Sequence, residues 1–554
     1  MSELRLGLFL CDCGEEIAPL LDMEALQREA CSLPDVAVVR RLRYSCSPDG
    51  MEAIQSAIQA DRLDRVLVAG CTPRTMERRL RQACARAGLN EAFCQLVDIR
   101  ELCAWVHDDR QAATEKATDL LRMAAADLSL GEAQVEARAE IVPGVLVIGG
   151  GLAGLTAALT VASGGVPVTV VEREPELGGA LRGPGRDDEE AAESLAQRVA
   201  AVAGHAQIRV LVNHQVTAVT GRVGSYTAVV EGSGSASHSR EELDIGAIIV
   251  ATGAHGELPQ PDASAVAHML RLSQDESGFF VETRYRLRPE NYAERAIYVC
   301  GAAHFPVDWR EAEFQAVVAA FRALQYIRSG VASSHAPVAQ VTDEVCTGCA
   351  NCVGVCPYGA VTMHKREGVL DLAGVDPLLC KGCGSCVVVC PSKAIRMPQG
   401  SDSQLLMQID AALASANGEP RIVAFGCEWS GHAAAELAGA KRLHYPATVR
   451  PIRLGCSARM DPAHILWAFL SGADGVFVGA CPPGECHYVD GNLHAQERME
   501  ALREMLASRG FDQRRLRLEW VTPDDPHDFA KKITDFAQLI QALGRVASHV
   551  SPHL

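Results

Sequence analysis

Hydrophobic runs separated by helix-like segments occur at both ends of the chain. At the front, the runs Leu4–Leu10, Val36–Leu42 and Arg65–Ala69 predict three strands. Near the other end, four strand-like runs alternate with helix-like segments such as Asp461–Leu470 and Ala495–Ser508. These runs are Arg421–Gly426, Pro451–Leu454, Gly475–Ala480 and Arg515–Trp520. Strands that alternate with helices predict a parallel, doubly wound sheet.

A third α/β region lies in the middle of the chain. The hydrophobic strand Val145–Ile148 leads into three glycines at the spacing G-x-G-x-x-G, and a helix-like run and a second strand, Val168–Val171, follow. Glycines at this spacing permit a tight turn, close approach of a pyrophosphate and close packing of helix on strand. Glu172 comes 23 residues after Gly149, where an acid can bind a ribose hydroxyl. The pattern predicts a dinucleotide site, and a purely structural glycine turn is the alternative.

The same region raises the question of a membrane span. Ile141 to Val171 contains no charged residue, which on length alone suggests a transmembrane helix. Seven glycines and two prolines interrupt this stretch, and it carries the nucleotide pattern. We therefore favour a soluble nucleotide-binding domain and expect no membrane span in the chain.

Three further stretches indicate that the nucleotide is FAD. The stretches Glu176–Gly179, Ala247–Ala254 and Ala296–Asp308 resemble segments that recur in flavoproteins of the disulfide-reductase type. Only 47 residues separate Gly253 from Gly301, too few for the NAD(P)H domain that such enzymes usually insert. Electrons are therefore expected to arrive through clusters or a partner. The candidate FAD-binding residues are Gly149, Gly151, Gly154, Glu172, Gly178, Gly179, Thr252, Gly253, Gly301 and Asp308.

The cysteine pattern C-x2-C-x2-C-x3-C-P occurs twice, and it is typical of bacterial two-cluster ferredoxins. In such pairs the fourth cysteine of each run ligates the other cluster. One [4Fe–4S] cluster is thus predicted on Cys346, Cys349, Cys352 and Cys390, and the other on Cys380, Cys383, Cys386 and Cys356. Zinc ligation or simple packing of the thiols would be the alternative, but two full copies with both prolines argue against it.

Cysteines also follow the strands at the C-terminal end. Carboxyl ends of parallel strands share one sheet edge, where such folds bind ligands. Four cysteines at that edge predict a cluster, and we favour [2Fe–2S] over zinc or a catalytic thiol because a ferredoxin pattern lies next to them. The four are Cys427, Cys456, Cys481 and Cys486.

The N-terminal region looks like a repeat of the C-terminal one. Cys46 and Cys71 are 25 residues apart, and so are Cys456 and Cys481. We infer that the two end domains share a duplicated fold. The N-terminal copy is predicted either to hold a further cluster or, equally, to contain buried structural thiols. The cysteines concerned are Cys11, Cys13, Cys46 and Cys71. The remaining cysteines show no ligand spacing and are interpreted as packing residues: Cys31, Cys84, Cys94, Cys103 and Cys300.

Composition limits the functional classes. The chain has 554 residues and a net charge of −17, which argues against a general nucleic-acid binder. Its 21 cysteines fall in clusters with short spacings, and we expect no signal peptide before them. Metal ligation in a reducing cytoplasm is therefore expected, rather than disulfides.

The order of these motifs resembles a known family. CDCG, YSCSPDGMEAIQSAI, VLVAGCTPRT and GLNEAFCQLVDIRELCAWVH, followed by the flavin pattern, GAAHFPVD and the two ferredoxin runs, resemble the A subunit of heterodisulfide reductase over about residues 1–400. Residues 421–510 are similar to the delta subunit of methyl-viologen-reducing hydrogenase, and similar fusions occur in the B subunit of quinone-interacting oxidoreductase. Two departures are the missing middle nucleotide domain and Ser430, which stands where the delta subunit commonly has a cysteine.

The predicted organisation is a multidomain α/β protein: an N-terminal α/β domain (1–140), an FAD domain (141–335), a ferredoxin domain (336–400), a linker (401–420) and a delta-subunit-like domain (421–554). The resemblance implies a cytoplasmic FAD and iron–sulfur oxidoreductase subunit that relays electrons, with flavin-based bifurcation as an implied refinement. Implied partners are heterodisulfide reductase B- or C-like subunits, a hydrogenase, a formate dehydrogenase, or a membrane quinone-interacting subunit. The alternatives are a self-contained flavin oxidoreductase, a non-catalytic scaffold that carries clusters, and a quinone-linked subunit. No catalytic acid–base pair is predicted.

Overall fold

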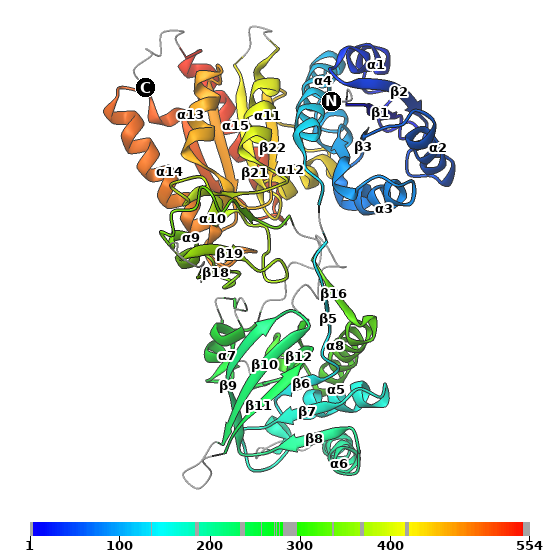
Figure 1. The fold of residues 1–554 in the computed structure, drawn as a ribbon, viewed down its shortest axis with the longest axis vertical. Helices are drawn as coiled ribbons and strands as arrows, with labels where there is room; N and C mark the ends of the chain where they lie inside the picture. Colours follow the sequence, from blue (N-terminus) through cyan, green and yellow to red (C-terminus); the bar gives the residue numbers. More distant parts are fainter. Residues whose placement is uncertain are drawn as a thin grey trace. The chain divides into compact units, whose positions relative to one another are not determined.

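The computed structural model describes residues 4–134, 136–182, 188–232, 239–255, 258–270, 272, 274–275, 277–280, 296–334, 337–365, 371–415 and 420–546. The chain forms two compact units (Figure 1). The first unit comprises residues 1–135, 336–376 and 380–554, and the second comprises residues 136–335 with 377–379. The domain ends predicted at 335, 336 and 554 lie outside the described residues.

The N-terminal domain of the first unit is a four-stranded, fully parallel sheet in the order β2-β1-β3-β4. Every residue of β1 is buried, because helices cover both faces of a parallel sheet. The strands are β1 (Leu6–Cys11), β2 (Val36–Leu42), β3 (Arg65–Gly70) and β4 (Cys94–Asp98). The helices are α1 (Met23–Ser32), α2 (Pro48–Ala60), α3 (Pro73–Arg86) and α4 (Arg110–Leu130), with a π-helical turn, η2 (Arg100–Ala104), before α4.

The C-terminal domain has a sheet of the same kind. Its order, β22-β21-β23-β24, repeats the N-terminal one strand for strand, and all of its pairs are parallel. The strands are β21 (Ile422–Cys427), β22 (Val449–Leu454), β23 (Gly475–Ala480) and β24 (Leu516–Trp520). The helices are α12 (Gly431–Ala440), α13 (Pro462–Leu470), α14 (Gly491–Ser508) and α15 (Pro526–Leu543), with a short turn, η6 (Ser457–Arg459), after β22.

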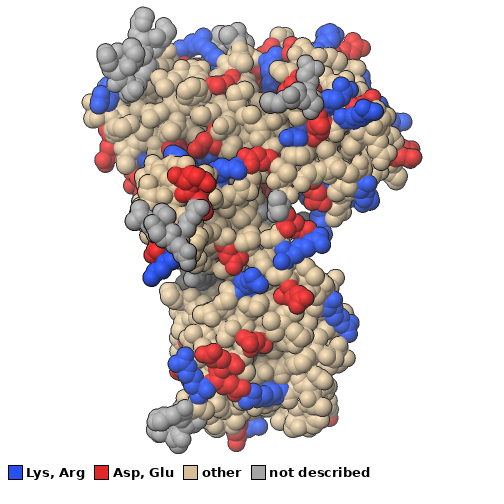
Figure 2. Space-filling model, viewed as in Figure 1, with Lys and Arg blue, Asp and Glu red and all other residues tan. Residues whose placement is uncertain are grey.

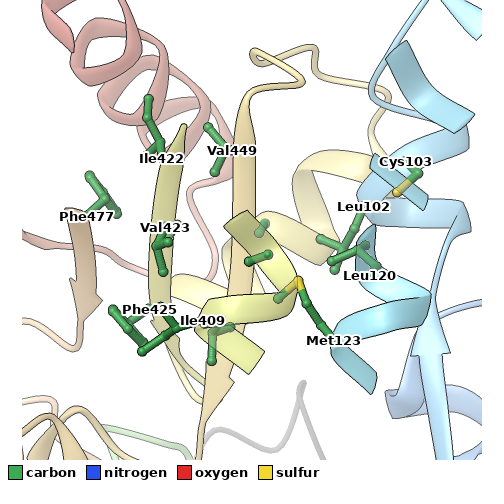
Figure 3. Packing of buried hydrophobic residues seen from close by; sticks show 14 of the residues in the cluster. Leu102, Cys103, Leu120, Met123, Ile409, Ile422, Val423, Phe425, Val449 and Phe477 are labelled. Atoms are coloured by element: carbon green, nitrogen blue, oxygen red, sulfur yellow. The ribbon is translucent and has the colours of Figure 1, made fainter. Parts of the chain in front are cut away.

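The two end domains pack on each other through one apolar core. This core contains Leu102, Leu120 and Met123 from the N-terminal side, together with Val423 and Phe425 of β21 (Figure 3). Burial of this apolar surface joins segments more than 300 residues apart in sequence into one unit.

The segment predicted as a linker, residues 401–420, is wrong in part, because it contains helix α11 (Asp402–Leu413). Ser401 caps α11 in a capping box with Gln404, and Ile409 lies in the shared core. A polar stretch of this kind can also mark a helix start, as Ser401 and Gln404 do here. Residues 416–419 lie outside the described residues.

The ferredoxin segment is small and irregular, as the spacing of its cysteines requires. Two short helices, α9 (Asn351–Gly354) and α10 (Ser385–Val388), each begin inside a cysteine run. Two antiparallel pairs hold the segment: β17 (Gln340–Val341) with β20 (Ile395–Arg396), and β18 (Val361–His364) with β19 (Leu372–Val375).

The second unit contains a five-stranded parallel sheet in the order β15-β12-β6-β7-β8. This order reverses beside β6, the arrangement at which doubly wound sheets bind dinucleotides. Its strands are β6 (Val145–Ile148), β7 (Val168–Val171), β8 (Ile208–Leu211), β12 (Ala247–Val250) and β15 (Ile297–Val299). An antiparallel sheet, β9 (His214–Arg222), β10 (Ser225–Gly232) and β11 (Arg240–Ile245), accompanies it.

The other elements of the second unit are helices and short strand pairs. The helices are α5 (Leu152–Ser163), α6 (Glu189–Ala203), α7 (Ala263–Leu270) and α8 (Trp309–Ser329). The pairs are β5 (Arg138–Glu140) with β16 (Val331–Ser333), and β13 (Ala254–His255) with β14 (Leu258–Pro259).

The surface carries both signs of charge. On the face drawn in Figure 2, acidic and basic side chains are interspersed over both units. Among the described residues, no helix is long and apolar enough to cross a bilayer.

Candidate functional site

The predicted nucleotide loop joins β6 to α5. Gly149 has φ +109°, and a Cβ there would collide with the carbonyl of Ala251. A Cβ on Gly154 would collide with the carbonyl of Gly149, so glycine is needed at both positions. Gly151 caps α5 without any side-chain hydrogen bond, and the first N–H groups of the helix are left for a ligand. This is the arrangement in which a helix N-terminus binds phosphate.

Glu172 closes the loop from the next strand. Its carboxylate accepts hydrogen bonds from the Gly150 N–H at 2.6 Å and the Glu174 N–H at 2.9 Å. The side chain is buried, so these two bonds fix its orientation at the end of β7. An acid held in this place is suited to a ribose hydroxyl.

The other candidate FAD residues surround the same sheet edge. Gly178 donates its N–H to the Gly150 carbonyl at 2.9 Å, and a Cβ on Gly179 would lie 3.2 Å from the Cα of Gly151. Thr252 has a buried hydroxyl without a hydrogen-bond partner, and Gly253 follows it with φ +77°. These glycines keep the edge open to a ligand, and the Thr252 hydroxyl is available to one.

Gly301 and Asp308 lie at the end of the same domain. Gly301 follows β15 with φ +65° and donates its N–H to Gln315. Asp308 caps α8 by accepting from the Glu311 N–H at 2.8 Å. Asp308 is thus occupied as a helix cap, a role that its sequence motif did not indicate.

The eight ferredoxin cysteines line two separate hollows. One hollow is lined by Cys346, Cys349, Cys352 and Cys390. The other is lined by Cys356, Cys380, Cys383 and Cys386. Each hollow therefore takes three cysteines from one run and the fourth from the other run, which is the crossed arrangement that the sequence predicts.

Backbone geometry shapes these hollows. Gly348, Gly382 and Gly384 have φ between +69° and +80°, and this left-handed conformation lets the chain wrap around the cysteines. Burial raises the pKa of Cys383 to about 11 and also raises that of Cys386. Thiols with a raised pKa in an apolar hollow need a cation to be held as thiolates, so the residues fit an iron–sulfur cluster.

The four C-terminal cysteines meet at the carboxyl edge of their sheet. All four are buried, and the sulfurs of Cys427 and Cys481 lie 3.9 Å apart. Hydrogen bonds from the thiols of Cys456 and then Cys481 hold the pKa of Cys427 well below its usual range. A Cβ on Gly491 would lie 2.7 Å from the Cys456 sulfur, so glycine keeps room for the thiols.

Ser430 and Trp429 complete this site. The Ser430 hydroxyl donates to the Val521 carbonyl at 2.6 Å, so its oxygen is used in packing. Trp429 stacks on His487 with ring centroids 3.5 Å apart and donates its N–H to Tyr488. The stack connects the loop after Cys427 with the loop after Cys486, and it had no signal in the sequence pattern.

The N-terminal cysteines also gather at a sheet edge. Cys11 ends β1, and its sulfur accepts from the Ser45 N–H at 3.4 Å, next to Cys46. The Cys13 thiol donates to Cys11 and lowers the pKa of Cys11 to about 5. Arg100 donates to the Cys13 sulfur at 3.2 Å. Cys71 follows β3 at the same edge, where burial raises its pKa to about 11.

The second ferredoxin hollow abuts the C-terminal cysteine site. A Cβ on Gly455 would lie 3.7 Å from the Gly382 carbonyl, so the segments that carry Cys456 and Cys383 are in contact. Arg459, three residues after Cys456, packs its Cδ 2.6 Å from the Cβ position of Gly384. Arg459 is buried and is held by the Gly400 carbonyl and by Asp402. This contact could not be read from the sequence.

A buried polar network joins the N-terminal site to the C-terminal domain. Arg100, which contacts Cys13, is paired with Glu101, and Glu101 accepts from the Thr72 N–H. The Thr72 hydroxyl donates to Glu436 of α12 at 2.9 Å.

The network then reaches the residue next to Cys427. Arg74 is ion-paired with Glu436 and donates to the Glu428 carbonyl at 2.6 Å. Asp98 lies in the same region, and burial and then the charge of Glu101 raise its pKa well above its usual range.

The remaining cysteines separate into two groups. Cys84, Cys94, Cys103 and Cys300 are buried, as their interpretation as packing residues requires. Cys31 is exposed at the end of α1, so that interpretation is wrong for Cys31.

A site for a single metal ion differs in geometry from a site for an iron–sulfur cluster. Within the described part of the chain, no three His, Cys, Asp or Glu side chains are arranged to hold one metal ion. Clusters distribute their thiolates over several iron atoms, so they need sulfurs farther apart than one ion does.

Comparison with protein families divides the chain in the same way. Residues 143–305 match the pyridine nucleotide-disulphide oxidoreductase family, and residues 345–399 match the 4Fe-4S dicluster domain. Residues 422–544 match the delta subunit of methyl-viologen-reducing hydrogenase.

Similar proteins cover the whole chain. The A subunit of the ferredoxin:CoB-CoM heterodisulfide reductase of Methanosarcina mazei is 25% identical over 99% of this chain and 98% of its own length. The corresponding A subunit of Methanosarcina acetivorans is 26% identical over 98% of each chain. A protein of Archaeoglobus profundus, described as similar to the A subunit of heterodisulfide reductase, is 39% identical over 41% of this chain and 33% of its own length. The first alignment spans 786 positions, so more than 200 positions of that relative have no counterpart here.

Proposed function

We propose that this chain relays electrons in series through the cysteine sites of its first unit. The chain is an oxidoreductase similar to the A subunit of heterodisulfide reductase, with a hydrogenase delta-type domain at its C-terminus. The series runs from the hollow of Cys346 to the hollow of Cys380 and then to the C-terminal site. FAD, when bound in the second unit, converts between two-electron and one-electron transfer. The chain supplies chiefly placement and the electrostatic surroundings of its cofactors.

The single observation that carries this proposal is the contact between Gly455 and Gly382. Each glycine immediately precedes a candidate ligand, Cys456 in one domain and Cys383 in the other. If these cysteines hold clusters, the two loops that carry the ligands would be the main protein segments between the clusters. That proximity supports direct electron transfer between a cubane and the delta-type site.

The cofactors follow from the residues. The hollows of the ferredoxin segment suit one [4Fe–4S] cluster each, and the four buried C-terminal thiols suit a [2Fe–2S] centre. The N-terminal set of Cys11, Cys13, Cys46 and Cys71 gathers at one sheet edge and suits a further cluster. Arg100 beside Cys13 would offset the negative charge of its thiolates.

The FAD-binding role rests on the β6–α5 loop. Gly149, Gly151 and Gly154 leave room for a pyrophosphate, and Glu172 is oriented for the ribose. The described residues between Gly253 and Gly301 form only α7, the short β13–β14 pair and β15. We therefore assign the electron supply to a partner protein rather than to a nicotinamide nucleotide bound by this chain.

Anaerobic purification of the native complex tests the proposal. We expect one FAD and about ten irons per chain, or about fourteen if the N-terminal cysteines hold a cubane. Mass spectrometry of co-purifying proteins then identifies the partner class: a hydrogenase, formate dehydrogenase or disulfide-reductase subunit, or a membrane quinone-linked subunit. Protein that retains its clusters but lacks flavin, or that reduces its flavin with a small substrate and has no partner, would contradict the proposed relay.

A further inference from the structure

Two cysteines outside every site described above lie unusually close together. The sulfurs of Cys84 and Cys94 are 2.8 Å apart. Nonbonded atoms of carbon size or larger attract best at about 3.5–4.0 Å, and a disulfide bond is about 2.05 Å long. The two sulfurs are therefore closer than ordinary packing contact, and a small movement would bring them within bonding distance.

Two elements of the fold, a helix and a strand, fix the positions of Cys84 and Cys94. Cys84 lies in the last turn of α3, and Cys94 is the first residue of β4. Between them the chain turns at Gly88, which has φ +94°. Both side chains are completely buried among Leu80, Leu89 and Leu96.

We propose that Cys84 and Cys94 form a reversible dithiol–disulfide site that crosslinks the end of α3 to the start of β4. The other ends of these elements lie beside the N-terminal cysteine site: α3 follows Cys71, and β4 ends at Asp98. The crosslink would therefore restrain α3 and β4, the elements that position Arg74 and Asp98 beside the N-terminal cysteine site. This inference does not depend on the proposed electron relay.

The oxidant is a low-molecular-weight disulfide, acting by thiol–disulfide exchange. One cysteine thiolate attacks the reagent and forms a mixed disulfide, releasing the first reagent thiolate. The second cysteine loses its proton and attacks the first cysteine's sulfur, so the bond from that sulfur to the reagent breaks and the second reagent thiolate leaves. The pair loses two electrons and two protons in total, and the reagent disulfide becomes two thiols. Because burial raises the pKa of Cys94, the exchange is slow and requires opening of the segment.

The test uses the full chain with its cofactors, incubated without oxygen in buffers of reduced and oxidised dithiothreitol. Acid quenching and alkylation trap the thiols, and trypsin digestion separates the two cysteines onto peptides 82–86 and 87–100. We expect these two peptides to appear as one crosslinked species whose fraction follows a two-electron titration. Cys103, buried to the same extent, is the internal control and should be alkylated throughout.

Hydrogen exchange on the same samples shows whether the segment opened. Oxidation should slow exchange in residues 80–98 at least about tenfold in the wild type, and have no effect in Cys84→Ala or Cys94→Ala. Absence of the crosslinked peptide at the most oxidising ratio, in samples whose α3 amides have exchanged, would overturn the proposal. So would equal protection of this segment in the oxidised and reduced wild type.

Discussion

Single residues determine whether the flavin domain can hold its ligand. Gly149 combines a positive φ with a position where any Cβ meets a backbone carbonyl. Gly165 also has a positive φ, +79°, but a Cβ there would meet nothing within 4 Å. Substitutions at these two glycines therefore distinguish the effect of backbone strain alone from the effect of a steric clash at the nucleotide loop.

Gly149→Ala should weaken FAD binding at least about tenfold, because the loop must move away from the pyrophosphate. Gly165→Ala should cost roughly 1–2 kcal/mol of stability from its left-handed backbone and leave FAD affinity unchanged. FAD titration of deflavinated protein, with thermal unfolding of each variant, measures both effects. Equal losses of affinity in the two variants would contradict the role of the loop.

Arg459 is the charged residue best placed to influence two clusters together. It lies three residues after Cys456 and packs on Gly384, between Cys383 and Cys386. Loss of a buried positive charge disfavours the more negative, reduced form of a nearby cluster. Arg459→Met should therefore lower the midpoint potentials of the second ferredoxin cluster and of the C-terminal cluster.

The matched control for Arg459 is Arg498 of α14. Arg498 supports the same turn by donating to the Ala458 and Met460 carbonyls. Arg498→Met should lower the potential of the C-terminal cluster alone. The measurement is an EPR-monitored redox titration, and Arg459→Lys should restore most of the lost potential. Unchanged potentials in Arg459→Met, with full iron content, would show that the residue only packs.

At the scale of elements, α4 and α12 connect the two end domains through buried charges. Lys116 of α4 is completely buried, donates to His107 at 3.2 Å and lies 4.5 Å from the Tyr445 ring. Burial lowers the pKa of Lys116 to about 7. In the unfolded chain the pKa of lysine is about 10.4.

This shift of the Lys116 pKa predicts a pH dependence of stability. Between pH 7 and about 10, the unfolded chain holds the proton that the folded chain has lost, so the free energy of unfolding rises with pH. Below pH 7 both states are protonated and the full burial penalty applies, on the order of 4 kcal/mol. Lys116→Met should remove this part of the rise between pH 7 and pH 9.5 in denaturant unfolding. The same slope in wild type and variant would contradict the account.

Glu436 of α12 accepts from Thr72 and is paired with Arg74 across the domain boundary. Glu436→Gln leaves the partly buried Arg74 without its counter-charge, and we expect a loss of about 3 kcal/mol in stability. The control is Arg442→Gln, which removes an exposed ion pair with Glu16 and should cost less than about 1 kcal/mol. Denaturant unfolding monitored for the first unit compares the two. Similar losses in both variants would show that the buried network does not hold the domains together.

The sequence allowed the elements to be predicted but not their contacts. The hydrophobic runs predicted most strands of the three parallel sheets, but not β4 or β8. These two edge strands are only partly buried, so neither has a continuous apolar run. Thr72 and Glu436 are 364 residues apart, and no sequence pattern links them, so only the folded chain brings them together. The linker prediction failed because Ser401 and Gln404 serve as a helix cap and not as flexible polar residues. The crossed cysteine sets were predictable, because ferredoxin spacing fixes which run each ligand comes from.

At the scale of the whole molecule, the first unit gathers three candidate cluster sites and the N-terminal cysteine set. The order of these sites in space differs from their order in sequence. The C-terminal site contacts the ferredoxin segment through Gly455, and the buried network reaches the N-terminal set through Glu436 and Arg100. The proposed serial relay rests on the first of these contacts, between the ferredoxin segment and the C-terminal site.

We propose that the second ferredoxin cluster and the C-terminal cluster are neighbours that exchange electrons directly. EPR of the fully reduced chain, compared with Cys383→Ser, tests whether the two clusters are neighbours. We expect a C-terminal cluster signal that is split or relaxes faster through coupling to the reduced cubane, and an uncoupled signal when Cys383→Ser disrupts that cubane. A C-terminal signal identical in the two proteins, with all clusters present in the wild type, would contradict the relay.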